Sequence, residues 1–124
     1  MDFEHTKKTK DLMSIVADFI NTHIRPAENI YAEEMETYRK EGDQWRVPKI
    51  LYELKEKAKG AGLWNFSLTG DLGYGLTNLE FAPLAEMMGV GWTSEVFNSS
   101  APDAGNMEVL DKYGTEEQKD KWLK

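Results

Sequence analysis

The sequence predicts an all-α protein, a helical bundle of about five to six helices. Apolar residues recur at spacings of three and four along most of the 124-residue chain, which is the period of one helix face. The strict alternation of apolar and polar residues that marks a half-buried strand is missing, and the β-branched residues are scattered. The length and the 40% share of hydrophobic residues fit a single globular domain over residues 1–124.

A proline separates the first two predicted helices. Residues 6–23 carry one apolar stripe and form the first helix. Pro26 is expected to stop this helix or to kink it into the next, because proline donates no backbone hydrogen bond and disfavours helix just before it. The second helix is expected over residues 27–40. Its acidic residues are expected to form a solvated face, and they are Glu33, Glu34 and Glu36.

Glycine and proline also divide the middle of the chain. Residues 41–47 form a polar linker, and Pro48 fits the first turn of a third helix over residues 49–61. Gly60 and Gly62 are expected to end that helix. Residues 63–76 form an irregular glycine-rich loop that matches neither nucleotide-binding fingerprint, so we expect it to wrap its aromatic side chains back onto the helices.

Two capping boxes mark the starts of later helices. The side chains of Thr77 and Glu80 can each bond the other's backbone N–H, which predicts a fourth helix that Gly89 closes. Thr115 and Gln118 have the same spacing and predict a last helix that runs to the end of the chain.

Between these two boxes, the chain is expected to turn before it becomes helical again. Residues 90–94 are expected to be a turn, and residues 95–100 to begin a helical segment that Pro102 interrupts. Helix is expected to resume over residues 103–113. Gly114 is expected to be the left-handed residue that follows the helix.

Composition excludes several classes of function. The formal net charge is -7 and no block of Lys or Arg is present, which argues against nucleic acid and anionic membranes as partners. There is no cysteine, so disulfides and thiolate metal sites are excluded. The start of the chain has no apolar signal region and no run could span a bilayer, so the expected location is cytoplasmic.

The sequence predicts no catalytic residue and no metal site of its own. His5 and His23 lack the spacing of a zinc pair. Ser99 and Ser100 have no neighbouring histidine to activate a hydroxyl. Four carboxylates on mixed faces are expected to be surface charges, caps or hydrogen-bond partners, and they are Glu86, Glu95, Asp103 and Glu108.

Five stretches, in order and with similar spacing, resemble the N-terminal helical domain of acyl-CoA dehydrogenases. They are residues 21–28; 45–48 with 54–58 and 61–65; 75–80 with 84–89; 95–98 with 101–103 and 105–110; and 113–119 with 122–123. The resemblance covers nearly the whole chain from about residue 10 onward. It departs from the family at Ser67 and Thr69, where relatives usually have an aromatic residue and a proline.

The resemblance implies a parent enzyme that dehydrogenates acyl-CoA thioesters between their α and β carbons with FAD. In that family FAD lies between a middle β domain, a C-terminal helical domain and a neighbouring subunit, and the catalytic Glu belongs to the C-terminal domain. Residues 1–124 resemble neither of those two domains. We therefore expect this chain alone to bind no FAD and to have no turnover.

The resemblance also implies one contribution to substrate binding. In relatives the matching segment lines the distal end of the acyl-chain cavity, and the residues that it assigns to this wall are Phe97, Asn98, Ala101, Pro102 and Gly105. The alternative for these residues is packing between helices alone. For the whole chain, the alternative is a stand-alone interaction or oligomerisation module, or a split-gene subunit without catalysis, that binds a second copy or a partner chain through exposed apolar surface.

Overall fold

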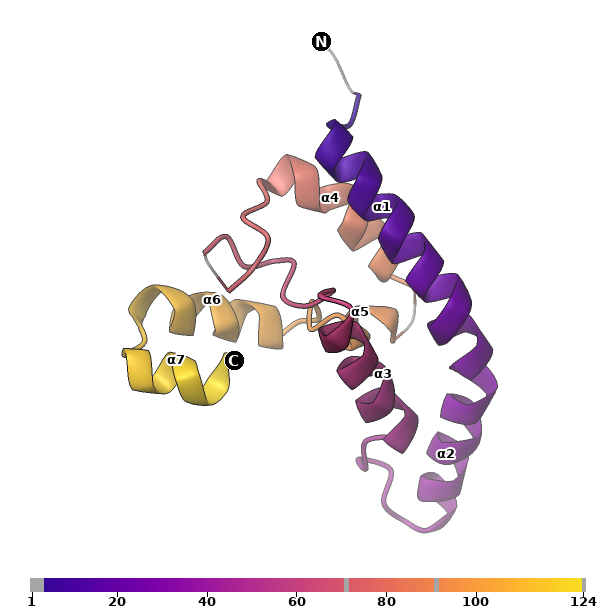
Figure 1. Cartoon of the computed structure of the whole chain (residues 1–124). Coiled ribbons are helices and arrows are strands. Elements are labelled where there is room, and N and C mark those ends of the chain that lie inside the picture. The colour runs from indigo at the N-terminus through magenta and orange to yellow at the C-terminus, as the bar shows by residue number, and fades with distance from the viewer. Residues whose placement is uncertain (1–3, 71, 91, 124) are drawn as a thin grey trace.

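The described part of the protein consists of helices and the loops between them (Figure 1). It is a computed structural model that describes residues 4–70, 72–90 and 92–123. Its α-helices are α1 (Lys7–Phe19), α2 (Glu28–Lys40), α3 (Lys49–Gly60), α4 (Asn78–Met88), α5 (Thr93–Val96), α6 (Asp103–Tyr113) and α7 (Glu116–Trp122). No strand occurs within these residues, so the predicted all-α class is confirmed. None of the helices in this part is long and apolar enough to cross a membrane.

The first two helices form one long rod that Pro26 does not stop (Figure 1). Between α1 and α2 the backbone passes through a π-helical turn at Ile20–Ile24 and a 3-10 turn at Arg25–Ala27. A proline ring clashes with the carbonyl group one turn earlier in a regular α-helix. The wider π turn relieves that clash, so the helix continues through Pro26, where the sequence predicted either a stop or a kink.

The main core lies between this rod and the shorter helices. In Figure 1, α4 crosses α1 and α3 runs beside α2, while the contacts of α5 are with α3 and α4. Fourteen buried residues of the described part form this core, from Val16 and Phe19 of α1 to Val96 and Phe97 at the end of α5. The helices α6 and α7 pack on each other to one side, over a smaller cluster made of Leu68, Met107 and Leu123.

The aromatic residues of the glycine-rich loop face the core, as predicted. Phe66 is 1% exposed, and its ring stacks on Tyr74 with 4.5 Å between the ring centroids. The hydroxyl of Tyr74 donates a hydrogen bond to the carbonyl of Gly62, which joins the loop to the end of α3. Burial raises the pKa of Tyr74 above its ordinary value.

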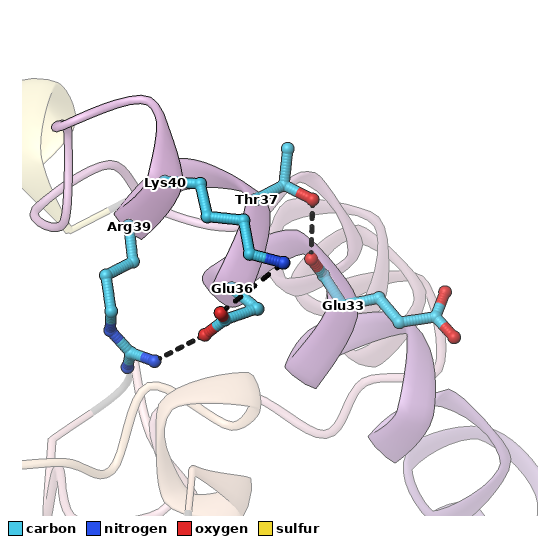
Figure 2. A network of polar contacts seen from close by, with 5 residues as sticks. All are labelled: Glu33, Glu36, Thr37, Arg39 and Lys40. Carbon is cyan, nitrogen blue, oxygen red and sulfur yellow. Dashed lines mark hydrogen bonds and ion pairs between the residues drawn. The ribbon is translucent and has the colours of Figure 1, made fainter.

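The acidic residues of α2 do different things. Glu36 pairs with Arg39 at 2.6 Å and with Lys40 at 3.6 Å on the solvated face (Figure 2). Glu34 is half-buried, and its carboxylate accepts a hydrogen bond from the backbone N–H of Ile50 at 3.1 Å. Because the N-cap residue of α3 is Pro48, which makes no side-chain cap, Glu34 supplies the acceptor and a favourable negative charge from the neighbouring helix. The prediction of a purely solvated face was therefore wrong for Glu34.

Two expectations about helix ends were also wrong. Gly114 has φ -70° and ψ 150°, which is extended and not left-handed. A glycine is needed there for space, because a Cβ atom would lie 2.5 Å from the carbonyl oxygen of Leu110. The helical segment expected over residues 95–100 is the single turn α5, which begins earlier and ends at Val96 because Asn98 adopts a left-handed φ of 53°.

Both predicted capping boxes are confirmed. The Thr77 hydroxyl accepts from the N–H of Glu80 at 3.3 Å, and the Glu80 carboxylate accepts from the N–H of Thr77 at 3.0 Å. Thr115 and Gln118 make the same reciprocal bonds at 3.3 and 2.9 Å. The backbone N–H of Thr77, and then its hydroxyl, hold the pKa of Glu80 below its ordinary value of 4.5.

The first prediction concerns the pH dependence of this cap. A carboxyl group with a lowered pKa in the folded state stabilises the fold above its unfolded pKa, and the contribution is lost as pH falls through the folded pKa. Glu80→Gln should therefore lower the free energy of unfolding at pH 7. The difference from the parent protein should shrink as pH falls below 4.5, and it should be lost once pH is below the lowered pKa of the folded state. Urea unfolding at pH 7 and pH 3.5 measures both values.

Gln118→Ala is the matched control, because the second capping box contains an amide that does not titrate. Its destabilisation should be about 0.5–1 kcal/mol and should be the same at both pH values. A Glu80→Gln effect that persisted unchanged at pH 3.5 would contradict this account of the cap.

Candidate functional site

The predicted wall residues lie on residues 97–105, which join α5 to the first turn of α6 and are called the wall segment below. The structure brings them together only in part. Phe97 is buried in the core, Asn98 is half-buried at the turn, and three small residues farther along are exposed. The exposed residues are Ala101, Pro102 and Gly105.

Phe97 anchors the start of the wall segment. Its side chain is 0% exposed, and its ring centroid lies 5.5 Å from that of Phe19 and 6.1 Å from that of Phe66, both with edge-to-face geometry. Aromatic pairs of this kind add about 0.5–1.5 kcal/mol to the area that they bury. Phe97 therefore supports the segment from beneath and does not face outward.

Asn98 ends α5 in the left-handed conformation. Its N–H donates to the carbonyl of Glu95, and the N–H of Ser99 donates to the carbonyl of Ser94, which is the Schellman arrangement of a helix C-terminus. The Asn98 carboxamide donates to Oδ1 of Asn65 and to Sδ of Met107, each at 2.8 Å. Asn98 thus joins the wall segment to the loop after α3 and to α6.

Asn65 was not singled out from the sequence, and the structure places it directly against the wall segment. It is 2% exposed and has a φ of 60°. Besides accepting from Asn98, it donates its backbone N–H to the carbonyl of Phe97 at 3.2 Å. The signal in the sequence is weak: asparagine is the residue other than glycine that most readily takes a left-handed backbone, but that preference names no partner.

The exposed part of the wall segment consists of small side chains at the start of α6. Ala101 and Pro102 are joined by a cis peptide bond, and both are exposed. Gly105 lies in the first turn of α6, and a Cβ atom built there would have no described neighbour within 4 Å. Glycine in a helix costs about 1 kcal/mol relative to alanine. Packing within this domain does not explain the glycine.

Two cavities lie elsewhere on the described part of the domain. One, of about 260 Å³, lies between the π turn and the end of α4, where Ile20, Arg25 and Met87 help to line it. The other, of about 270 Å³, lies between the glycine-rich loop and α6, against Ser67 and Asp111. Sites for small molecules usually have about 300–1,000 Å³, so neither cavity can enclose a flavin dinucleotide. The described residues also contain no cluster of acidic or histidine side chains that could hold a metal ion.

Three of the four carboxylates considered earlier are exposed, and the fourth is half-buried. Glu86, Asp103 and Glu108 are exposed, and Asp103 is in the first turn of α6, where its charge favours the helix dipole. Glu95 is half-buried beside Tyr31, whose pKa is raised first by burial and then by the Glu95 charge. The Tyr31 ring stacks on Trp92 with 4.3 Å between the ring centroids. The surroundings of these carboxylates match the surface charges, caps and packing partners expected from the sequence.

Ser67 has a buried hydroxyl with no hydrogen-bond partner among the described residues. It borders the cavity of about 270 Å³, at a position where the resemblance leads us to expect an aromatic residue. The sequence analysis identified Ser67 as a departure from the family. In the structure this position holds a buried polar atom without a partner, beside a cavity, and both features are unfavourable for packing.

The described residues thus form an all-helical domain that exposes a segment of small residues between α5 and α6. The family model described as acyl-CoA dehydrogenase, N-terminal domain, matches residues 6–124. The chain therefore belongs to the acyl-CoA dehydrogenase family and is an N-terminal domain of it.

Relatives agree in sequence and in structure. The chain is 43% identical to acyl-CoA dehydrogenase family member 10 of Mus musculus, covering 92% of this chain and 11% of the relative. It is 43% identical to a probable acyl-CoA dehydrogenase of Mycobacterium tuberculosis, covering 100% of this chain and 30% of the relative. A putative acyl-CoA dehydrogenase from Mycobacterium abscessus has a solved structure that matches with a TM-score of 0.83 and 41% identity, over 97% of this chain and 31% of that one. The chain thus spans less than a third of each.

The second prediction concerns Ser67. Ser67→Ala removes a hydroxyl that is buried without a partner, so it should raise the free energy of unfolding by about 1 kcal/mol. Ser100→Ala is the control, because its hydroxyl donates to the carbonyl of Ala101 at 3.3 Å and its loss should bring no gain. Urea unfolding compares the two variants. A Ser67→Ala protein that is no more stable than the parent would contradict the prediction.

Proposed function

We propose that this domain forms part of the wall of the acyl-chain cavity in an FAD-dependent acyl-CoA dehydrogenase. The reaction proposed for the whole enzyme is dehydrogenation of an acyl-CoA thioester between its α and β carbons. Residues 1–124 contribute packing between domains and the shape of the cavity, while the base and the flavin contacts come from other parts of the enzyme. Alone, the chain is expected to have no turnover.

The observation that carries the proposal is the free space at Gly105. A helical glycine with no neighbour leaves room for a group from outside the domain, and at Gly105 this room adjoins the exposed residues Ala101 and Pro102. Ala101 and Pro102 extend this strip of small, exposed side chains, and apolar surface of this kind suits a hydrocarbon chain. Phe97 and Asn98 hold the strip from the core side.

The third prediction tests this wall with substrates of different length. Residues 1–124 are joined to the remainder of the Mycobacterium abscessus relative in place of its own matching domain. Gly105→Leu should then lower kcat/KM for the longest acyl-CoA accepted by about tenfold or more relative to a short one, because added side-chain volume excludes methylene groups. FAD content should not change. Absorbance of the flavin and turnover with a series of acyl-CoA thioesters give both values.

Gly60→Leu is the matched control. Gly60 is also helical, exposed and free of neighbours within 4 Å, but it ends α3 and does not belong to the wall segment. It should leave the ratio between long and short substrates unchanged. If Gly105→Leu gave the same ratio as Gly60→Leu, the proposed wall would be wrong. In the chain alone, Gly105→Ala should raise the free energy of unfolding by up to about 1 kcal/mol.

A second candidate function is association through exposed apolar surface. Val109 and Tyr113 lie one turn apart on α6 and are 59% and 76% exposed, and Trp122 of α7 is 64% exposed. Large apolar side chains in such positions favour burial against another polypeptide. Under this proposal the domain binds a second copy or a separately encoded partner.

The fourth prediction concerns this association. The isolated chain at micromolar concentration should sediment as a dimer or larger species, because burial of Tyr113 and Trp122 is favourable. Replacing both with serine should give a monomer, whereas Trp45→Ser should not, since Trp45 is 86% exposed but lies in the linker between α2 and α3. A parent chain that stays monomeric would contradict self-association.

A further inference from the structure

Two asparagines with strained backbones meet where the wall segment begins. Asn65 and Asn98 are 33 positions apart in the sequence, and both have left-handed φ values, 60° and 53°. Residues other than glycine are uncommon in this region, and such strain persists only where the surroundings fix it. These two are the described residues other than glycine with positive φ, and they contact each other directly.

Other helices of this domain show what an ordinary end looks like. α2 and α3 finish in the same Schellman hydrogen-bond pattern, but their left-handed residues are Gly42 and Gly62, with φ values of 83° and 72°. A glycine would satisfy the backbone after α5 with less strain. The carboxamide is what asparagine adds at position 98, and it is used in bonds to Asn65 and Met107.

The bond between the carboxamides is part-buried, with its Asn65 end inside the domain. Asn65 is 2% exposed, and its Oδ1 accepts from Nδ2 of Asn98 at 2.8 Å. A second bond, from the N–H of Asn65 to the carbonyl of Phe97, holds the residue just before Asn98. The buried polar groups of Asn65 are costly to leave without partners, so the two bonds together fix the direction in which the chain leaves the core.

We propose that Asn65 is a positioning residue for substrate selection, acting through the carboxamide of Asn98. It fixes the start of the wall segment, and thereby the place of Gly105 against the acyl chain. The inference rests on the proposed wall function, but it concerns a residue that lies outside the wall segment and faces the interior.

Hydrogen exchange on the full 124-residue chain tests the contact itself. Asn98→Gly and Asn65→Gly keep backbones that tolerate the left-handed turn and remove one carboxamide each. The amide of Ser99 donates to the carbonyl of Ser94, and the amide of Ala104 donates to the carbonyl of Ser100. In each variant both amides should exchange about tenfold faster than in the parent, after correction for any change in global stability. Amides in the middle of α1 report that global change.

The double variant distinguishes a shared bond from two separate effects. If Asn65 acts through its bond to Asn98, the double variant should exchange no faster at Ser99 than Asn98→Gly alone, which also removes the bond to Met107. Asn65→Gly combined with Asn21→Ser is the control cycle, since Asn21 lies exposed in the π turn, and its effects should add. Additive acceleration in the 65/98 cycle, or equal acceleration throughout the chain, would overturn the proposal.

Turnover in the joined enzyme tests the effect on substrate. Asn65→Gly should change the ratio of kcat/KM between long and short acyl-CoA thioesters several-fold, with the same FAD content. An unchanged ratio in Asn65→Gly, beside a changed one in Gly105→Leu, would overturn the positioning role and leave the wall intact. An unchanged ratio in both would overturn the wall function and this inference with it, whatever the exchange data show.

Discussion

The burial of Phe97 is the constraint on which the rest of this domain depends. Its ring meets Phe19 from α1 and Phe66 from the glycine-rich loop, so three segments far apart in sequence converge on one side chain. Removing a buried phenylalanine costs about 3–5 kcal/mol, which is a large part of the stability of a small domain. Because Phe97 is fixed, the next residues must leave the core at one place, and the exposed strip follows from that exit.

Local chemistry explains most of what the sequence could predict. The capping boxes at Thr77 and Thr115, and the bounds of α6, depend on residues within one turn of each other, and these expectations were confirmed. The role of Glu34 and the contact between Asn65 and Asn98 were missed, because their partners lie 16 and 33 positions away in sequence. No helical periodicity carries that information.

The candidate site could be predicted only as a segment. Resemblance to the family named five residues without ranking them, and the structure separates Phe97, which is fully buried, from Gly105, which is exposed with free space around it. Gly114 gives the same lesson for a single residue type. Its sequence position fitted a left-handed turn, but a close carbonyl oxygen is the reason for the glycine. The sequence alone does not show whether a glycine is required for a left-handed backbone or for lack of space beside its Cα atom.

The π turn before Pro26 has a consequence for how one rod serves two neighbours. α1 packs on α4, whereas α2 packs on α3, so the rotation of α2 about the axis of the rod decides which of its residues meet α3. Successive residues of an α-helix are about 100° apart around its axis, and one residue more or fewer in the turn would swing the α2 face by that angle. The π turn therefore sets the rotation of α2 about the axis of the rod while the backbone stays helical.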